Sequence, residues 1–449
     1  MNNLKAISPL DGRYFKHIEE MSEYFSEYGL IRMRVDVEIE YFIFLSTFIP
    51  ELSEITDDNV TQLRKISSEF SEEDACVVKK IEEKTRHDVK SVEYFLRMKF
   101  EDLGLERYIS FIHFGLTSED INSVVYVTQL WKFKSCIYNK LVHEILDVLL
   151  GYGTMYKDIP MLSRTHGQAA TPTTVGKEFM VYHERILNVY THLRKIDYKT
   201  KFGGAVGRLN AHVVAYPDVD WHSKMNDFIA HYSHRKDFMM GRHRYTTQID
   251  HYENYSMIYD IIRRINCILV DLCVDMWLYI SMDYFKMSVV KDEVGSSAMP
   301  HKVNPIMFEN AEGNLLLSNS LLSFLSNKLP VSRLQRDLSS STVLRNVGVA
   351  LSHTILSFKN IILGLKRISL DEDVVLKDFK NNPVVIAEAI QSILRSRGCG
   401  DAYELMKAFV RSNKKISEVE IHNFIKTLNI DNTLKKRLLT LSPINYIGI

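Results

Sequence analysis

The strongest constraint on the fold is a stretch from Arg242 to Val294 that contains neither glycine nor proline. Apolar residues recur within it at alternating spacings of four and three, at Ile258, Ile262, Ile265, Leu269, Leu272, Met276 and Tyr279. This spacing forms one apolar stripe along a helix, as in coiled-coil packing. The sequence therefore predicts a long helix packed against other long helices.

Other parts of the chain favour the same architecture. No proline occurs between Pro50 and Pro160, and glycine is rare there, so this region can hold several long helices. The stretch from Gly151 to Thr174, rich in glycine, proline and hydroxyl residues, is expected to be a loop connecting two of them. Strands have little support anywhere. The predicted fold class is therefore all-α, with a central bundle of long helices.

Length and composition limit the possible domains and partners. The 449 residues suffice for about three domains, which we place at 1–112 (N-terminal, helical), 113–366 (central long-helix bundle) and 367–449 (small, C-terminal, helical). Basic and acidic residues are equal at 56 each, so nucleic acid is not an expected partner. Because the chain has no overall positive charge, any site that binds an anion must be a local cluster of basic residues.

Cysteine usage and hydropathy indicate a soluble cytoplasmic protein. The five cysteines are odd in number and form no CxxC or CxxH pattern, which argues against a disulfide framework and a structural zinc site. The N-terminal residues include no apolar signal region, and no run of 18 or more apolar residues occurs. We therefore expect neither secretion nor a membrane span.

The stretch GSSAMPHKVNPIMFENAEGN, residues 295–314, is predicted to be a hydroxyl-bearing loop followed by a helix. Pro300 excludes regular helix in the first half. Asn304 suits the N-cap, Pro305 the first helical position, and Glu309 falls about one turn inside. Taken alone, this pattern equally fits a surface loop with a helix start.

Three earlier polar clusters allow two interpretations each. The turn SPLDGRY presents Arg13 beside Tyr14, or is an ordinary N-terminal turn. In KTRHDV, residues 86–88 could share a ligand only at a helix end or in a crowded cleft, and otherwise form a solvated helix face. In HFGLTSEDIN, Thr117 or Ser118 can cap the following helix, a structural task that needs no further function.

Two later clusters carry histidine and arginine. His166 lies in the polar stretch SRTHGQAATPTT, where it has little core to satisfy, so a chemical role competes with that of a solvated loop residue. In VSRLQRDLSSSTVLRN, arginines stand beside four hydroxyl residues at a helix start, which suits an oxyanion site. The alternative is a basic turn paired with Asp337.

The chain lacks the motifs of several reaction classes. It has no HExxH, no GxSxG elbow and no nucleotide-cradling loop, and its glycine-rich FGGAVG at residues 202–207 matches neither GxGxxG nor a P-loop. The sequence therefore gives little support to three reaction classes: metal-dependent hydrolysis, acyl transfer and ATP-driven chemistry. Acid–base chemistry on an anion remains.

GSSAMPHKVNP closely resembles the signature loop of the fumarase/aspartase superfamily. SPLDGRY, KTRHDV, TSEDIN, THGQAATPTT, YTTQ, FENAEGN and QRDLSSSTVLRN resemble, in the same order, the motifs of the bacterial adenylosuccinate lyase family. The resemblance extends from about residue 7 to 350. It implies an all-α subunit in three domains, a homotetramer with active sites shared between subunits, and no cofactor.

The resemblance also implies a reaction, β-elimination of fumarate from adenylosuccinate, giving AMP, and from SAICAR, giving AICAR. By similarity Ser296 is the general base and His166 the general acid. A base must remove the weakly acidic C–H proton beside a carboxylate, and an acid must protonate the departing nitrogen. Lys302 and Asn304 would stabilise charge on the carboxylate side, and Glu309 would orient His166.

Substrate contacts follow from the same resemblance. Phosphate and ribose contacts are expected from Arg13, Tyr14, Arg336, Ser341 and Arg345. Contacts to the succinyl group or the base are expected from Arg86, His87, Asp88, Thr117, Ser118, Gln248 and Asn310.

The chain departs from the family pattern in two places. Gln248 is followed by IDHYENY instead of a Glu-Pro-His run, and Leu334 replaces a common tryptophan, which puts the packing near Gln248 in question. Within the superfamily, argininosuccinate lyase, fumarase and aspartase share the signature loop, but they need no phosphate site. A catalytically silent helical scaffold is the alternative from another class.

Overall fold

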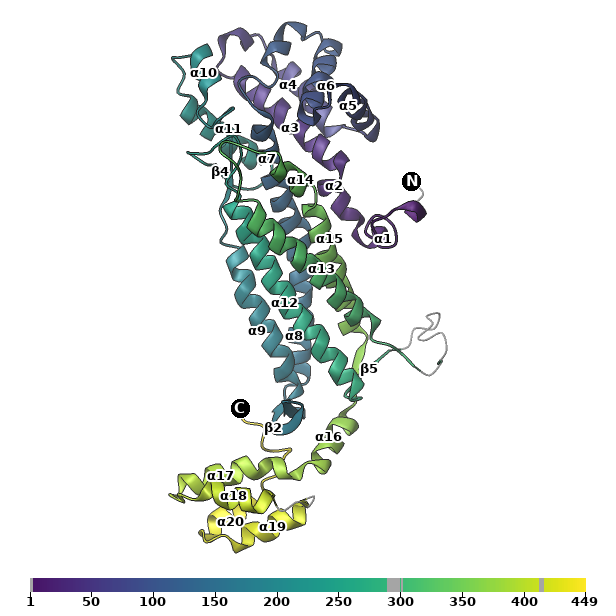
Figure 1. Cartoon of the computed structure of the whole chain (residues 1–449), viewed down its shortest axis with the longest axis vertical. Coiled ribbons are helices and arrows are strands. Elements are labelled where there is room, and N and C mark those ends of the chain that lie inside the picture. The colour runs from purple at the N-terminus through teal and green to yellow at the C-terminus, as the bar shows by residue number, and fades with distance from the viewer. Residues whose placement is uncertain (1–2, 289–298, 300–301, 412–415) are drawn as a thin grey trace. The chain divides into compact units, whose positions relative to one another are not determined.

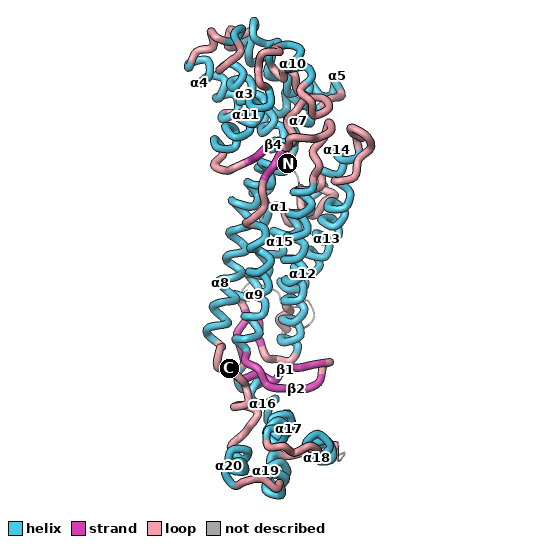
Figure 2. Tube along the Cα trace, turned by 90° about the vertical axis from the view of Figure 1, so that its left-hand side faces the viewer, coloured by secondary structure: helices cyan, strands magenta, loops and turns pink. Residues whose placement is uncertain are grey.

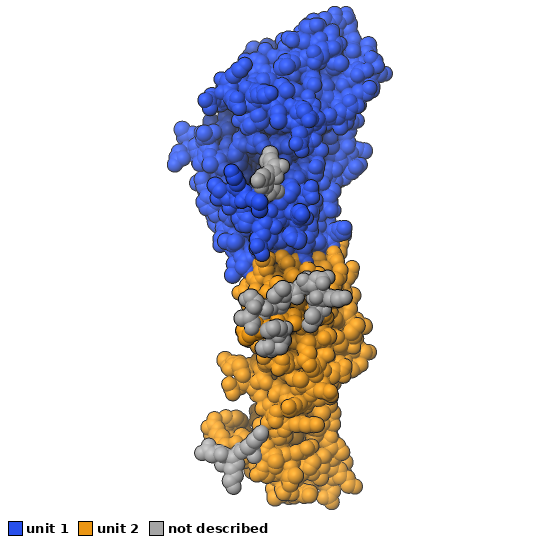
Figure 3. All heavy atoms as spheres, turned by 90° about the vertical axis from the view of Figure 1, so that its right-hand side faces the viewer, with its two compact units in different colours: residues 1–142, 189–267, 313–359 blue, residues 143–188, 268–312, 360–449 orange. Residues whose placement is uncertain are grey.

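The computed structural model describes residues 3–288, 299, 302–411 and 416–449. The chain divides into two compact units, shown in blue and orange in Figure 3. Unit 1 comprises Met1–Val142, Val189–Cys267 and Gly313–Lys359, and unit 2 comprises His143–Asn188, Ile268–Glu312 and Asn360–Ile449. The predicted division into three domains stays a prediction.

Unit 1 is mainly helical. Its helices are α1 (Phe15–Ile18), α2 (Ser22–Phe25), α3 (Glu27–Ser46), α4 (Asp57–Ser68), α5 (Glu72–Thr85), α6 (Asp88–Asp102), α7 (Ser118–Lys132), α10 (Asn210–Ala215), α11 (Trp221–Arg235) and α14 (Ser339–Leu344). Short 3₁₀ turns cover Asn3–Lys5, Glu19–Met21, Pro50–Leu52 and Glu106–Phe111, and a π-helical segment covers Phe133–Tyr138. Strand β3 (Tyr198–Thr200) pairs in parallel with β4 (Met240–Arg242).

Unit 2 contains two antiparallel pairs, β1 (Pro160–Thr165) with β2 (Gln168–Thr174), and β5 (Phe285–Met287) with β6 (Ile368–Leu370). Its C-terminal helices are α16 (Glu372–Asn381), α17 (Ala387–Ser396), α18 (Ala402–Val410), α19 (Glu418–Thr427) and α20 (Asn432–Leu439), with a 3₁₀ turn at Pro383–Ile386. A core that includes Ile390, Met406 and Ile425 holds this end together.

Long helices supply residues to both units: α8 (Asn139–Met155), α9 (Val175–Leu193), α12 (Glu253–Ser281), α13 (Ile306–Lys328) and α15 (Val347–Lys366). They lie side by side in Figures 1 and 2. Within unit 1, the buried Asn266 amide of α12 donates to Ser318 of α13 at 3.4 Å and to Thr354 of α15 at 3.0 Å. The helix predicted from the alternating spacing is α12, and the all-α class is confirmed.

One helical stretch stands out by its hydropathy. Among the described residues, one stretch, Ser339–Lys366, is long and apolar enough to cross a membrane, but 78% of its most apolar window is buried inside the protein. A core helix has this property. All five cysteines are free, as their number and spacing predict.

Two predictions are wrong for the stretch from Gly151 to Thr174. It is not an irregular loop, and it contains strands. Helix α8 continues to Met155, and residues 160–174 form the β1–β2 hairpin, in which Thr165 pairs with Gln168. The two residues between them, His166 and Gly167, have left-handed φ values of 55° and 73°. Two such residues form the tight turn whose twist matches paired strands, so the threonine-rich flanks become strands.

Helix α13 begins at Ile306, one residue later than predicted. The carbonyl of Pro305 accepts from the N–H groups of Phe308 and Glu309 at 3.0 and 3.3 Å. Pro305 therefore precedes the first helical residue. The prediction of a helix start carrying Glu309 in its first turn holds, and a one-residue shift lies within the usual uncertainty of helix ends.

A buried ion pair organises the start of α7. The side chains of Asp120 and Lys201 are both 0% exposed, and their charged atoms lie 2.7 Å apart. The same Asp120 oxygen accepts from the N–H groups of Gly203 and Gly204 at 2.7 and 3.1 Å, and its other oxygen accepts from Thr117 N at 2.8 Å. The FGGAVG stretch thus folds its backbone around a carboxylate. Gly204 and Gly207 have left-handed φ values of 75° and 71°, and a Cβ on Gly207 would clash with the Thr246 carbonyl oxygen, so the turn itself requires glycine.

We expect Lys201→Met to destabilise the protein by about 3–5 kcal/mol, because it leaves the Asp120 carboxylate buried without its counter-charge. The matched control is Lys79→Met in unit 1, since Lys79 is 44% exposed and pairs with Glu82 at 2.7 Å on the surface. That change should cost no more than about 0.5 kcal/mol. Urea denaturation measures both, and equal costs would contradict the assigned importance of the buried pair.

Candidate active site

Arg86, His87 and Asp88 lie at the junction of α5 and α6, so the interpretation as a solvated helix face is wrong. Arg86 is exposed and ends α5 with a left-handed φ of 54°. His87 caps α6, because its Nδ1 accepts from Lys90 N at 3.1 Å. In neutral His87 the proton therefore resides on Nε2, which faces the Ser118 hydroxyl at 3.5 Å. The helix end brings two predicted site motifs together.

Thr117 and Ser118 stand at the N-terminus of α7, as predicted. Thr117 is the N-cap residue, and its own N–H donates to Asp120. Both side chains are half-buried. Because the buried Asp120–Lys201 pair fixes this helix start, the two hydroxyl groups are held by the core of unit 1 rather than by a loose turn.

A second group forms around Arg336, which precedes α14. Its guanidinium donates to Gln248 Oε1 and to Ser341 Oγ, each at 3.2 Å. It also pairs with the buried Glu119 carboxylate at 3.0 Å. The structure therefore brings together three predicted substrate-binding residues, of which Gln248 is distant in sequence from Arg336 and Ser341. Helix α14 has only six residues, so the arginine side chain rather than the helix start supplies the positive charge here.

Gln248 has well-defined contacts, although the sequence around it departs from the family pattern. Its side-chain amide donates to Ala205 O at 3.0 Å, and its backbone N–H donates to Gln335 O at 3.2 Å. Leu334 is 94% exposed and has a left-handed φ of 50°, so it forms no part of this packing. The departures from the family pattern leave the Gln248 position anchored.

A third group joins Asp88 to Arg345. One Asp88 oxygen accepts from Arg345 at 3.1 Å and from the buried Arg34 at 2.8 Å, and Arg345 also pairs with Glu27 at 3.2 Å. Burial raises the pKa of Asp88, but the two guanidiniums outweigh it and the net pKa is lowered. Asp88 is therefore ionised throughout the physiological range and holds Arg345 in place.

Buried polar residues connect these groups into one network. Arg34 Nε donates to Asn122 Oδ1 at 2.9 Å, and Asn122 Nδ2 donates to Glu119 Oε1 at 3.0 Å. Glu119 in turn pairs with Arg336. The sequence analysis missed Arg34, Glu119 and Asn122 as members of the site. Glu119 and Asn122 lie inside the TSEDIN motif at positions facing the same side of α7, which was the available signal.

Arg13 and Tyr14 stand at the start of α1. The Arg13 guanidinium carbon lies 5.9 Å from the centre of the Tyr14 ring, and Tyr14 N donates to Pro9 O at 2.9 Å. Arg13 is exposed. Among the described residues, Arg13 donates no hydrogen bond to the network around Arg336 and Arg345.

The predicted catalytic residues belong to unit 2. His166 is exposed at the tip of the β1–β2 hairpin. Glu309 accepts from the Trp277 indole at 3.0 Å, and Asn310 accepts from Asn360 at 2.9 Å. Lys302 is exposed, and Asn304 is half-buried just before α13. Ser296 lies outside the described residues.

The expected pairing of Glu309 with His166 is not formed within the described part of one chain. Glu309 contacts Trp277 instead, and His166 makes no side-chain hydrogen bond to a described residue. An exposed histidine on a hairpin tip can act on a ligand only if other groups approach it. The arrangement within one chain is therefore incomplete for the predicted chemistry.

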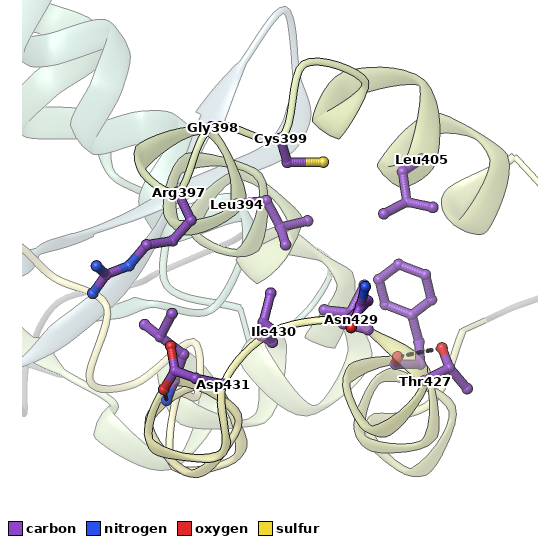
Figure 4. Close-up of a pocket in the computed structure, with 12 residues that line it drawn as sticks. Leu394, Arg397, Gly398, Cys399, Leu405, Thr427, Asn429, Ile430 and Asp431 are labelled. Atoms are coloured by element: carbon purple, nitrogen blue, oxygen red, sulfur yellow. Dashed lines mark hydrogen bonds between the residues drawn. The ribbon is translucent and has the colours of Figure 1, made fainter.

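A cavity of about 520 Å³ lies among the C-terminal helices (Figure 4). Its lining is mainly apolar and includes Leu394, Leu405 and Ile430, with Arg397 and Asp431 on one side. It contains none of the predicted site residues, so it is not the candidate active site. No group of three or more potential metal-binding side chains occurs in the described residues.

Known proteins resemble this chain along its whole length. The family model described as "Lyase" matches residues 12–317, and that described as "Adenylosuccinate lyase C-terminal" matches residues 332–447. A protein named adenylosuccinate lyase from Dictyostelium discoideum is 49% identical over 100% of this chain and 97% of its own length. Its namesake from Escherichia coli strain K12 is 40% identical with the same two coverages.

This chain belongs to the adenylosuccinate lyase family. Family members are carbon–nitrogen lyases, so the protein is an enzyme that processes small molecules. The fold agrees with that of a fumarate lyase from Mesorhizobium sp. BNC1, with a TM-score of 0.76, 15% identity, and coverage of 96% of this chain and 95% of that one. A 3-carboxy-cis,cis-muconate lactonizing enzyme from Pseudomonas putida gives a TM-score of 0.75 at 18% identity, covering 96% and 94%. The resemblance to the fumarase/aspartase superfamily is confirmed.

His113, four residues before the TSEDIN motif, provides a pH-dependent contact. Its Nδ1 lies 2.6 Å from the fully buried Glu38 carboxylate. Burial lowers the pKa of His113, but the charge and hydrogen bond of Glu38 outweigh burial and the net pKa is raised. The resulting stabilisation is fully present below the unfolded-state pKa of about 6.5 and is lost as pH rises through the folded-state pKa.

We expect the free energy of unfolding of the wild type to fall more steeply than that of His113→Asn as pH rises above about 6.5. Asparagine tolerates the left-handed φ of 60° at this position. Urea denaturation between pH 6 and pH 9 measures the two slopes, with exposed His231→Asn as the control that should keep the wild-type slope. Identical slopes for all three proteins would contradict the contribution of the pair.

Proposed function

We propose that this enzyme catalyses β-elimination of fumarate from adenylosuccinate, giving AMP, and from SAICAR, giving AICAR, in the purine biosynthesis of the cytoplasm. The full-length similarity to proteins named adenylosuccinate lyase carries this proposal. The match of residues 332–447 to a family named for adenylosuccinate lyase favours it over argininosuccinate lyase, fumarase and aspartase.

In this proposal the network of unit 1 binds the nucleotide end of the substrate. Arg336 and Ser341 bind phosphate and ribose together with Arg345, Arg13 and Tyr14. The observed contacts support a binding role for Arg336, whose guanidinium is held by Glu119, Gln248 and Ser341 and is 23% exposed. A pre-positioned arginine loses little conformational freedom when it binds an anion.

The proposed contacts to the succinyl group and the base come from Arg86, His87, Asp88, Thr117, Ser118, Gln248 and Asn310. His87 supports this proposal, since its capping role directs the Nε2 proton toward Ser118 and a ligand. Ser118 and His87 can then share one carboxylate oxygen as donors.

The chemical step is proposed to use Ser296 as general base and His166 as general acid. Ser296 removes the proton from the carbon beside a succinyl carboxylate, and the electron pair moves to form the fumarate double bond. The C–N bond breaks, and His166 protonates the departing nitrogen. Lys302 and Asn304 stabilise the charge that develops on the carboxylate side, and Glu309 orients His166. No cofactor takes part.

We further propose that the enzyme is a homotetramer with active sites shared between subunits. Two observations support it. The exposed His166 and Glu309 find no contact with each other within one chain, which a second subunit can supply. Exposed apolar side chains line the long helices, including Trp277, Leu317 and Phe324 at 44–56% exposure. Such a surface is unfavourable in water and is covered in an assembly.

Turnover of adenylosuccinate should fall by about 10²–10⁴-fold in Ser296→Ala and in His166→Ala, the range that a general base or acid contributes. An ultraviolet assay of fumarate release measures this loss. Mixing the two inactive variants should restore activity, because hybrid tetramers contain sites with both residues intact. Mixing Ser296→Ala with Lys302→Ala, two positions only six residues apart in the sequence and therefore expected to enter the same site from one subunit, should restore none.

Three outcomes would contradict these proposals. Full turnover by Ser296→Ala would remove the proposed base. Elimination from argininosuccinate, with none from adenylosuccinate, would assign another substrate. Restoration of activity in neither mixture would argue against active sites shared between subunits.

Arg336→Lys should raise the KM for adenylosuccinate about tenfold or more with a smaller effect on kcat, because lysine cannot keep the three contacts that hold the guanidinium. Arg333→Lys is the matched control three residues away, since Arg333 is 81% exposed and pairs with Asp337. The control should change KM less than twofold. Steady-state kinetics distinguishes them, and equal KM values for both variants would exclude Arg336 from substrate binding.

A further inference from the structure

A cavity of about 480 Å³ in unit 1 lies among α3, α4, α7 and α11 and includes none of the predicted site residues. Its volume falls in the range of small-molecule sites. Five basic side chains line it, from Arg32, Arg64, Lys132, Arg235 and Lys236. The acidic side chains in the lining are Asp36 and Glu40. The balance of charge in this cavity is therefore strongly positive.

Two arginines in the cavity share one carboxylate. Arg64 binds Glu40 through both oxygens, at 2.9 and 3.0 Å, and Arg235 Nε lies 3.3 Å from the second of these oxygens. Glu40 is 2% exposed, whereas Arg64 and Arg235 are 32% and 37% exposed. One carboxylate neutralises one guanidinium, so a positive charge remains beside a pair of partly open arginines.

The other basic side chains leave one more charge uncompensated. Lys236 pairs with Asp36 at 2.7 Å, and Arg32 pairs at 3.2 Å with Glu23, which lies outside the lining. Lys132 has no ion pair with a described carboxylate, and its ammonium lies 4.9 Å from the centre of the Trp131 ring. Five bases thus face three carboxylates. The cavity carries an excess of two positive charges.

The geometry favours one compact group with several oxygens as the ligand. Arg64 and Arg235 contact the same Glu40 oxygen, so their guanidiniums are neighbours rather than opposite ends of the cavity. Guanidinium groups bind phosphate bidentately, and phosphate offers several acceptor oxygens and nearly two charges at one point. A dicarboxylate separates its two charges along a carbon chain and matches neighbouring bases less well.

We propose that this cavity is a second anion site that binds a small phosphate-bearing molecule. It is distinct from the candidate active site, because Arg32, Asp36 and Glu40 recur every four residues on one face of α3. Arg34, which belongs to the active-site network, lies on the other face. The proposal goes beyond the proposed function and does not depend on it.

The test is isothermal titration of the full-length protein with inorganic phosphate at constant ionic strength. Lys132→Gln/Arg235→Gln should lose one equivalent of phosphate per chain or bind it at least tenfold more weakly. Arg235 is chosen over Arg64 because the buried Glu40 then keeps its bidentate partner and the fold is preserved. Lys134→Gln, two residues from Lys132 and outside the cavity lining, is the matched control and should bind as the wild type does.

Three further measurements make the outcome decisive. Arg336→Gln should keep the cavity's phosphate, which separates this site from the active site, and the Lys132→Gln/Arg235→Gln variant should keep its turnover of adenylosuccinate. Phosphate should raise the melting temperature of the wild type more than that of the cavity variant. Unchanged phosphate binding by the cavity variant would overturn the proposal, as would equally tight binding of fumarate at the same residues.

Discussion

The Asp120 carboxylate, buried at the start of α7, accepts hydrogen bonds from three backbone N–H groups and the Lys201 ammonium. A carboxylate without water is unfavourable unless such partners surround it. The hydrogen bonds that this carboxylate accepts join two segments that are distant in sequence, TSEDIN and FGGAVG. The position of Thr117 and Ser118, and through α7 that of Glu119 and Asn122, depends on this one interaction.

Charges on α3 and α7 extend this organisation. Arg34 and Glu119 are almost fully buried, and each would be costly alone. Together with Asn122 they form a chain of contacts that ends at Arg336 on one side and at Asp88 on the other. The network positions two exposed or half-exposed arginines, Arg336 and Arg345, to which the proposed function assigns phosphate and ribose binding. The buried polar side chains thus restrict the positions of two long and otherwise flexible arginine side chains.

The residues expected to perform the elimination are arranged differently. His166 is held by a hairpin turn and Glu309 by a helix start, and neither contacts the other in the described chain. Under the proposed function, the residues assigned to binding already contact one another within unit 1, whereas the residues assigned to the elimination would be completed by neighbouring subunits. Such a division would protect a reactive site from water until substrate and subunits complete it.

Sequence alone determined the helical class, the long α12 and the start of α13, because glycine and proline content and apolar spacing act through local backbone geometry. It also identified the family, since eight motifs occur in a fixed order. It did not predict the β1–β2 hairpin, whose turn depends on two consecutive left-handed residues, one of them His166. Arg34, Glu119 and Asn122 were also missed. Only the tertiary structure decided their role, because a buried charge is explained by partners that lie far away in the chain and come together through folding.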